Sequence, residues 1–486
     1  MDLTTDSFRQ GGPEMRHCNQ GWFREQFGFL RRQFLQEGDR SFASVLSDDL
    51  VKQALDTIGF EWKDRIYTPL VTLWVFLSQV ISADHSCRAA VARLVVQRVA
   101  HGRSACSSRT GAYCQARKKL PEQFFATIAC GVGEKLDRQT QDEWLWKGHR
   151  VLMFDGTTTV MPDTMDNRKA YPPTPNSKPG AGTPMARVAA VFSLSCGVVL
   201  DLATARYAGK GQGEVTLLRE LSHVFSKGNV LLADSLMCNW RNLFEFQQRG
   251  IHVVTRINKA LRKADFRKGK SLGKDDHIVE WPRPYIRGVG RKAQMAMPRQ
   301  LAVREARIHI RRRGYRTKVM IVVTTLLDSE LYTKEDLAEL YRQRWNNELD
   351  IRSLKTEMQM ECLRCKTPEL VRKEIWTHVL AYNLTRTLMA EVAIKNDTSP
   401  RAISFKGTLQ ILEAFQALIS FTASRNHAFR FRLQEQLLEA VATHRVADRP
   451  HRIEPRRLKR KYNRFDVLSV PREEAKRQIL KGLTKN

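Results

Sequence analysis

The chain has 486 residues, enough for two to four domains, and its 42% hydrophobic content is ordinary for a protein with a buried core. Its formal charge of +30, from 81 Lys and Arg against 51 Asp and Glu, indicates a polyanionic partner such as nucleic acid. No apolar stretch reaches the roughly 20 residues of a membrane-spanning helix, and the polar N-terminal segment does not resemble a secretory signal, so a cytoplasmic or nucleoid protein is expected.

The first part of the chain is predicted to be helical. Apolar residues recur every three or four positions up to about Lys147, as in PLVTLWVFLSQVI and CRAAVARLVVQRVA. The period then changes, because HRVLMFDGT is a short apolar run that ends at Asp155, and ARVAAVFSLSCGVVLDLATARYAG predicts two strands that turn near 195–197. The Pro- and Gly-rich segment 162–184 between them predicts an irregular loop.

Helices and strands are predicted to alternate after this point. A helix is expected at 214–226, followed by NVLLADS, a second apolar run that ends at an acid, Asp234. A helix at 238–249 and the strand IHVVTRI come next. This order predicts an α/β layer with a mixed sheet.

Basic residues are concentrated in two blocks. Residues 259–318 contain 19 basic and 5 acidic residues, interleaved with aromatic side chains, and end at the strand KVMIVVTTLL. Residues 441–486 contain 14 basic and 5 acidic residues, including RRLKRKYNR. Each block alone could be a solvated face or tail, but together they favour a protein that grips a long anion at several places.

A helix that begins near Thr333 carries LYRQRWNNELDIRSLK. At 100° per residue, one stripe about 80° wide holds five polar side chains, with Trp345 beside it. These five are Tyr341, Arg344, Glu348, Arg352 and Lys355. The neighbouring, core-facing stripe holds Leu337, Leu340, Ile351, Leu354 and Met358. Taken alone, the polar stripe is equally compatible with a helix stabilised by ion pairs four residues apart.

A set of three carboxylates favours a functional role for the polar stripe over a purely structural one. Asp155 and Asp234 each end an apolar run, where an α/β sheet presents its chemistry, although either Asp alone could simply form a turn or a cap. With Glu348 they predict an oxygen cage for two Mg²⁺ or Mn²⁺ ions, which activate the attacking oxygen and stabilise the leaving oxygen of a phosphodiester. The remaining stripe residues are predicted to bind DNA by phosphate contacts and stacking: Tyr341, Arg344, Trp345, Arg352 and Lys355.

These residues resemble the signature of a known family. YRQRWNNELDIRSLK matches Y-(2)-R-(3)-E-(6)-K, the signature of the insertion-sequence-four family of bacterial transposases, which belong to the DDE group. DGTTT at Asp155 and LLADS at Asp234 resemble the first and second acidic motifs of that family. The resemblance extends from about Tyr67 to Arg386 and includes RCKTPELVRKEIWTHVLAYNLTR.

The resemblance implies an α/β RNase H-like catalytic core with a β-rich insertion, flanked by helical N-terminal and C-terminal regions. The expected segments are an N-terminal helical, DNA-binding region (1–148), the core in two parts (149–257 and 332–395), the basic insertion (258–331) and a C-terminal helical region with a basic tail (396–486). It also implies metal ligation by Asp155, Asp234 and Glu348. The implied partners are double-stranded DNA, as terminal inverted repeats and target, and a second copy of the chain.

Two points depart from the family pattern or stay open. Many members have Arg after the second acid, where this chain has Ser235. The aromatic residue that relatives use to trap a flipped base could be Trp281 or Tyr285, although either could simply pack in the insertion. Two other functions remain possible at this point: a nuclease of the same fold that cuts without joining, and a non-catalytic DNA-binding derivative of a transposase.

Overall fold

The computed structural model describes residues 20–34, 40–42, 44–60, 62, 65–174, 182–310, 319–422, 426–446, 470 and 472–482. The basic cluster expected at 456–464 lies outside these ranges, as does 311–318 of the first basic block. Across the described ranges, every helix is too short or too polar to cross a membrane.

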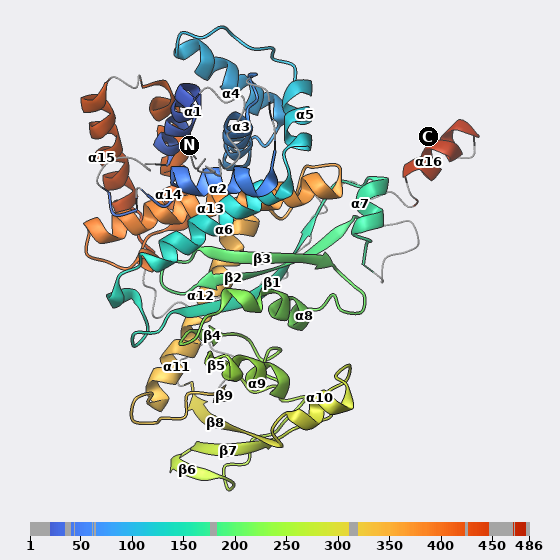
Figure 1. Cartoon of the computed structure of the whole chain (residues 1–486), viewed down its shortest axis with the longest axis vertical. Coiled ribbons are helices and arrows are strands. Elements are labelled where there is room, and N and C mark those ends of the chain that lie inside the picture. Colours follow the sequence, from blue (N-terminus) through green and yellow to red (C-terminus); the bar gives the residue numbers. More distant parts are fainter. Residues whose placement is uncertain are drawn as a thin grey trace, which may run out of the picture.

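The described strands form one mixed sheet of nine, in the order β3-β2-β1-β4-β5-β9-β8-β7-β6 (Figure 1). Strands β1, β4 and β5 are parallel to one another, and the other neighbouring pairs are antiparallel. The strands are β1 (Val151–Val160), β2 (Met185–Ser193), β3 (Val199–Arg206), β4 (Val230–Leu232), β5 (His252–Arg256), β6 (Lys270–Gly273), β7 (Asp276–Pro282), β8 (Gln300–His309) and β9 (Val319–Thr324). The expected α/β layer with a mixed sheet is therefore confirmed.

Two predictions from the sequence need correction. Strand β1 does not end at Asp155 but continues to Val160, because its second half still pairs with β2. The segment 162–184 contains a short helix, α7 (Met165–Ala170), which begins where the Thr164 side chain accepts a hydrogen bond from the Asn167 backbone N–H. The predicted turn between β2 and β3 is confirmed.

The strands of the insertion, residues 258–331, extend the core sheet. Strand β9 pairs with β5 on one side and with β8 on the other, so β8, β7 and β6 add to the same hydrogen-bonded array. In Figure 1 these strands and α10 (Arg291–Ala296) lie at one end of the long axis, and the helical regions lie at the other.

Helices from both ends of the chain pack together on the sheet. The long helix α13 contacts α3 and α6, and α6 and α13 both contact β3. The side-chain amide of Asn383 in α13 joins α13 to both β3 and α6. Its Oδ1 accepts a hydrogen bond from the Val199 N–H at 2.9 Å. Its Nδ2 donates to the Val199 carbonyl at 2.8 Å and to the Ala129 carbonyl of α6 at 3.0 Å.

The described helices follow the predicted pattern in most places. Before the sheet lie α1 (Gln20–Gln33), α2 (Asp48–Ile58), α3 (Pro69–Ile81), α4 (Cys87–Ala100), α5 (Gly111–Lys119) and α6 (Glu122–Arg138). Between the strands lie α8 (Glu214–Glu220) and α9 (Trp240–Gln248), within the helical segments expected there. After the sheet come α11 (Lys334–Gln343), α12 (Trp345–Arg352), α13 (Pro368–Lys395), α14 (Phe405–Phe421), α15 (His427–Thr443) and α16 (Arg472–Leu480).

Candidate active site

The parallel register of three strands aligns three polar residues. The last paired residues of β1, β4 and β5 are Met153, Leu232 and Val254. Two positions further along come Asp155, Asp234 and Arg256. Because neighbouring strands run roughly 4.8 Å apart and side chains alternate with period two, these residues form one row across the sheet. Asp155 lies within β1 and Asp234 lies two residues after the end of β4, near enough for the Asp234 carboxylate to contribute to the raised pKa of Asp155.

Asp155 lies in a partly buried, anionic environment. The pKa of Asp155 is raised to about 6, first by burial and then by the nearby carboxylates of Asp234 and Glu214, while the Gly156 N–H and Arg344 act in the opposite direction. A divalent cation would reverse this effect, since it stabilises carboxylates in their ionised form.

Glu214, at the start of α8, is a residue of the site that the sequence analysis missed. Its carboxylate pairs with Arg187 of β2 at 2.6 Å. It also lies against Gly156, where an added Cβ would be 2.9 Å from the Glu214 Oε1 atom. Glycine beside Asp155 therefore leaves room for this third carboxylate.

The predicted helix around Glu348 is broken. Helix α11 begins as expected at Thr333, whose side chain forms a capping box with Asp336. The helix ends at Gln343, and α12 begins at Trp345, because the Asn347 N–H bonds the Arg344 carbonyl three residues back. A π-helical turn, Ser353–Glu357, follows α12 directly. The uniform 100° spacing therefore holds only within each piece.

Arg344, at the break, links Glu348 to the row of aspartates. Its Nη2 donates to Glu348 Oε1 at 2.8 Å. Burial alone would lower the pKa of Arg344, but the pKa is raised because Glu348, Tyr341 and Asp155 all surround the guanidinium. We call Asp155, Asp234, Arg344 and Glu348 the open site, since the Glu348 side chain remains 41% exposed.

The comparisons with known proteins identify the family. Residues 146–384 match the family described as the transposase DDE domain. The transposase InsG for insertion sequence element IS4 of Escherichia coli (strain K12) is 25% identical over 367 residues, which cover 73% of this chain and 77% of that protein. The chain belongs to the insertion-sequence-four family of DDE transposases.

Two further likenesses are more limited. The transposase for insertion sequence element IS421 of Escherichia coli is 36% identical over 61 residues, 13% of this transposase and 16% of that protein. The cryo-EM structure of a piggyBac transposase synaptic complex with hairpin DNA aligns with 82% of this chain and 84% of that one, at 11% identity and a TM-score of 0.41, a likeness too weak to define a common fold.

The predicted DNA-binding residues of the transposase differ in exposure. Arg352 and Trp345 are exposed, with 67% of the Arg352 side chain accessible, although Arg352 also approaches Glu357 at 3.8 Å. Lys355 is half-buried, in the π-helical turn. Tyr341 is almost buried, and its pKa is raised, first by burial and then by Asp234. The structure thus leaves Trp345 and Arg352 open to a partner and Tyr341 largely inside.

The core-facing stripe is confirmed except at one position. Leu337, Leu340, Leu354 and Met358 are buried, whereas Ile351 is half-buried. In the insertion, Trp281 is buried, its indole N–H donates to Glu305 at 2.7 Å, and Arg262 lies over its ring. Tyr285 is 82% exposed. Of the two candidates, only Tyr285 is accessible to a base.

Two further residues near the aspartates, Arg256 and Glu214, have recognisable sequence contexts. IHVVTRI, like the two aspartate segments, is an apolar run with a charged residue near its end, and Arg256 is the last residue of β5, the strand that pairs with β4. Glu214 is the first residue of α8 and directly follows a Gly-rich segment, 209–213.

DDE transposases generally depend on divalent metal ions, and the donor chemistry here fits such an ion. Asp155, Asp234 and Glu348 offer carboxylate oxygens, which Mg²⁺ and Mn²⁺ prefer. Among the described residues, no three His, Cys, Asp or Glu side chains are close enough to hold a metal ion as they stand. Glu348 instead pairs with Arg344, so joint ligation requires these side chains to rearrange.

Proposed function

We propose that this transposase cleaves DNA at the ends of an insertion sequence and transfers the ends into target DNA, a cut-and-paste reaction at the open site. The observation that carries the proposal is the parallel register that aligns Asp155 with Asp234, opposite the Arg344–Glu348 pair. The strand order around this register, β3-β2-β1-β4-β5 with β2 antiparallel, supports an RNase H-like core.

Asp155, Asp234 and Glu348 would hold two Mg²⁺ or Mn²⁺ ions. When bound, such ions activate the attacking oxygen and stabilise the leaving oxygen of the phosphodiester. The side chains would fix the ions on the rigid sheet, and Glu348 would exchange its partner Arg344 for them. Arg344, released from Glu348, would then be free to contact a DNA phosphate.

The surrounding residues would hold the DNA strand. Lys355, Arg352 and Arg256 would provide cations for phosphate contacts, and exposed Trp345 would provide a stacking face. Tyr341 would contact DNA through its hydroxyl at the margin of the core. The helical N-terminal region 1–148 and the basic insertion 258–331 would bind more distant DNA.

The DNA partners would be the terminal inverted repeats of the element and the target duplex. Family resemblance implies that two element ends are paired, so the active species would be a homodimer on DNA. The charge of +30 supports extended contact with a long polyanion.

The test is a set of single substitutions assayed on a duplex that carries the inverted repeat flanking the gene. Asp155→Ala, Asp234→Ala and Glu348→Ala should each reduce cleavage at least ~1,000-fold, since each removes charge stabilisation of the transition state, while binding measured in chelator stays within about three-fold. Chelation of divalent ions should stop cleavage by the unmodified protein, and Mg²⁺ or Mn²⁺ should restore it.

The matched control is Asp163→Ala, which removes a carboxylate that pairs with Arg168 after β1 and lies outside the open site. It should retain cleavage. Normal cutting by any of the three test variants would remove that residue from the catalytic set. Supplying pre-cut ends separates the functions, because a nuclease that cannot join would leave those ends unjoined.

A further inference from the structure

Helix α12 carries two acids that point in nearly opposite directions, since residues two apart on an α-helix are separated by about 200°. Glu348 faces Arg344 and is partly exposed, whereas the Asp350 side chain is completely buried. Asp350 therefore lies on the side of α12 away from the open site, and the proposed chemistry does not use it.

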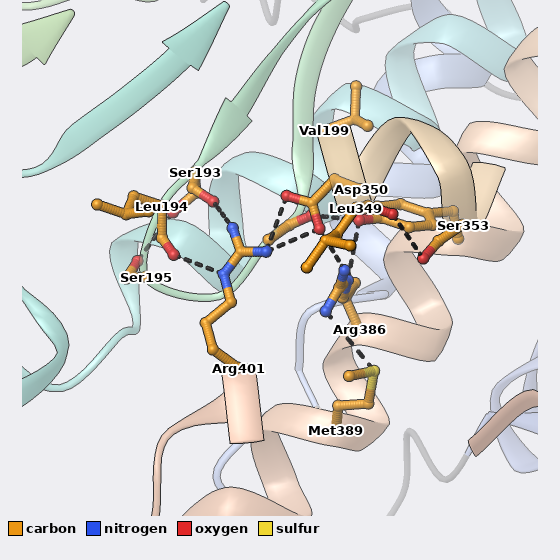
Figure 2. Close-up of polar contacts among 12 residues, drawn as sticks. Ser193, Leu194, Ser195, Val199, Leu349, Asp350, Ser353, Arg386, Met389 and Arg401 are labelled. Carbon is orange, nitrogen blue, oxygen red and sulfur yellow. Dashed lines mark hydrogen bonds and ion pairs between the residues drawn. The ribbon is translucent and has the colours of Figure 1, made fainter. Parts of the chain in front are cut away.

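Two arginines from other elements bind Asp350 (Figure 2). Arg401, in the short helix η4 (Pro400–Ala402), donates from Nη1 to Asp350 Oδ1 and Oδ2 at 2.7 and 2.8 Å. Arg386 of α13 donates from Nη2 to Asp350 Oδ1. We call Asp350, Arg386 and Arg401 the Asp350 clamp. Such charge-assisted bonds are directional, so they restrict both the position and the rotation of α12.

Arg401 also binds the end of β2. Its Nε donates to the Leu194 carbonyl at 2.7 Å, and its Nη2 donates to the Ser193 carbonyl at 2.8 Å, as Figure 2 shows. Strand β2 pairs with β1, with Ala190 opposite Asp155. One guanidinium thus connects the helix that bears Glu348 to the strand next to the one that bears Asp155.

The turn between β2 and β3 is shaped to admit the clamp. Gly197 has a φ of 79°, and a Cβ there would lie 2.9 Å from Arg386 Cζ and 3.0 Å from Arg401 Nη1. Tyr382 completes the arrangement, because its hydroxyl donates to the Gly197 carbonyl at 2.7 Å and accepts from Arg386 Nε at 2.9 Å. Glycine is required here both by the backbone conformation and by the two guanidinium groups.

Helix α12 needs such an anchor. It is separated from α11 at Arg344 and passes into a π-helical turn at Ser353. On the buried side of α12, the Asn347 side chain is fully enclosed. Neither its Oδ1 nor its Nδ2 atom forms a hydrogen bond with the described residues. An unpaired buried amide opposes this packing, so the clamp has to offset it.

We propose that Asp350, held by Arg386 and Arg401, is the positioning residue that sets Glu348 against the strand bearing Asp155. This inference rests on the proposed role of Glu348 in catalysis. Asp350 acts through α12 and does not touch DNA, because its carboxylate is enclosed by protein.

The test is Asp350→Asn, which keeps the side-chain shape and removes the charge. The first-order cleavage rate on the inverted-repeat duplex with Mg²⁺ should fall about 10- to 100-fold, as expected for a small displacement of a catalytic group. The affinity for the same duplex in chelator should change less than about three-fold. Among amides that exchange by local opening, those of 345–357 should exchange hydrogen at least about ten-fold faster, and those of β8 should not change.

Asp163→Asn is the matched control, because Asp163 also pairs with one arginine through both carboxylate oxygens and is mostly buried. It should change neither the cleavage rate nor exchange at 345–357. If Asp350→Asn slows cleavage no more than this control, or if amides that exchange by local opening respond in β8 as much as in 345–357, α12 is not positioned by the clamp.

A second variant keeps the test decisive if Asp350→Asn does not fold. Arg401→Lys retains a cation but loses the paired contacts with Asp350 and the β2 carbonyls, so cleavage should fall about ten-fold with faster exchange at 345–357. Unchanged cleavage and exchange would overturn the proposal. Glu348→Gln separates the two hypotheses: it should abolish cleavage without changing exchange in α12, and continued cutting by Glu348→Gln would refute the catalytic role itself.

Discussion

The open site and the Asp350 clamp each take one acid from the same short helix, α12, yet the charges around these two acids differ. In the open site, Glu348 has one arginine partner and stays partly exposed, and the pKa of Asp155 is raised to about 6, first by burial and then by neighbouring carboxylates. In the clamp, Asp350 is completely buried and is met by two guanidinium groups. The open site is thus left able to accept further cations, and the clamp is already neutralised.

This difference separates residues that bind a partner from residues that maintain the fold. Ion pairs at the surface add little stability, whereas breaking a buried pair leaves an uncompensated charge. Helix α12 therefore combines a weakly held functional side with a strongly held structural side. Substitutions on the two sides should differ in stability, in pH dependence and in salt dependence of DNA binding.

The largest expected difference is in the free energy of unfolding. Asp350→Asn should lower it by about 3–5 kcal/mol, because Arg386 and Arg401 would remain buried without their carboxylate. Glu348→Gln should change it by less than about 1 kcal/mol, since this pair is partly exposed. Urea unfolding of the metal-free protein measures both values, and equal effects would contradict the distinction.

The second-largest expected effect is the pH dependence of the unfolding free energy, which we expect from two buried histidines that have no acidic partner of their own. His85 and His378 stack with ring centroids 5.9 Å apart. Burial, with a contribution from Arg364 that outweighs Asp84, lowers the pKa of His85 to about 4, and burial lowers the pKa of His378 to about 3. Both histidines are therefore neutral in the folded protein at pH 5, whereas the unfolded chain takes up protons below about pH 6.5.

Stability should consequently be lost as the pH falls from 6.5 toward 4, with about 2 kcal/mol lost at pH 5 for His85 alone. His85→Gln should reduce the difference in unfolding free energy between pH 7 and pH 5 by that amount. The comparison is made within each variant, so any constant effect of the substitution cancels. An unchanged difference would mean that His85 is not buried in its neutral form.

The smallest effect concerns the salt dependence of DNA binding. Lys355→Ala should flatten the slope of log affinity against log salt by about 0.9, the value for one phosphate contact on duplex DNA. Lys395→Ala is the control, because Lys395 is exposed at the end of α13 and pairs with Glu435. The same slope for both variants would remove Lys355 from the phosphate contacts.

Local sequence patterns were sufficient to predict much of the fold. Apolar runs predicted the strands, and the signature around Glu348 pointed to a helix that the structure contains. The runs did not show that β1 continues past Asp155, because Thr residues in its second half are compatible with either a strand or a loop. The strand continues since β2 supplies hydrogen-bond partners from a distant part of the chain.

The clamp could not have been predicted in the same way. Asp350, Arg386 and Arg401 are separated by up to 51 residues, and each is ordinary in its local sequence. Similarly, helical periodicity placed Glu348 and Arg352 on one stripe but contained no information about the break at Arg344, which depends on tertiary contacts. The spacing of residues along a helix identifies which side chains share a face of that helix. Only the packed structure shows which charged side chains form ion pairs.

The continuity of the sheet has a consequence for how this protein can be divided. Strand β9 covers β5, whose Val253 and Val254 are buried. Removing the residues from β6 through β9 would expose the backbone N–H and carbonyl groups of β5 along an apolar edge, which is a template for intermolecular strand pairing. Strands β6 to β9 therefore shield β5 from intermolecular pairing, and a chain shortened by these strands would need a replacement edge strand.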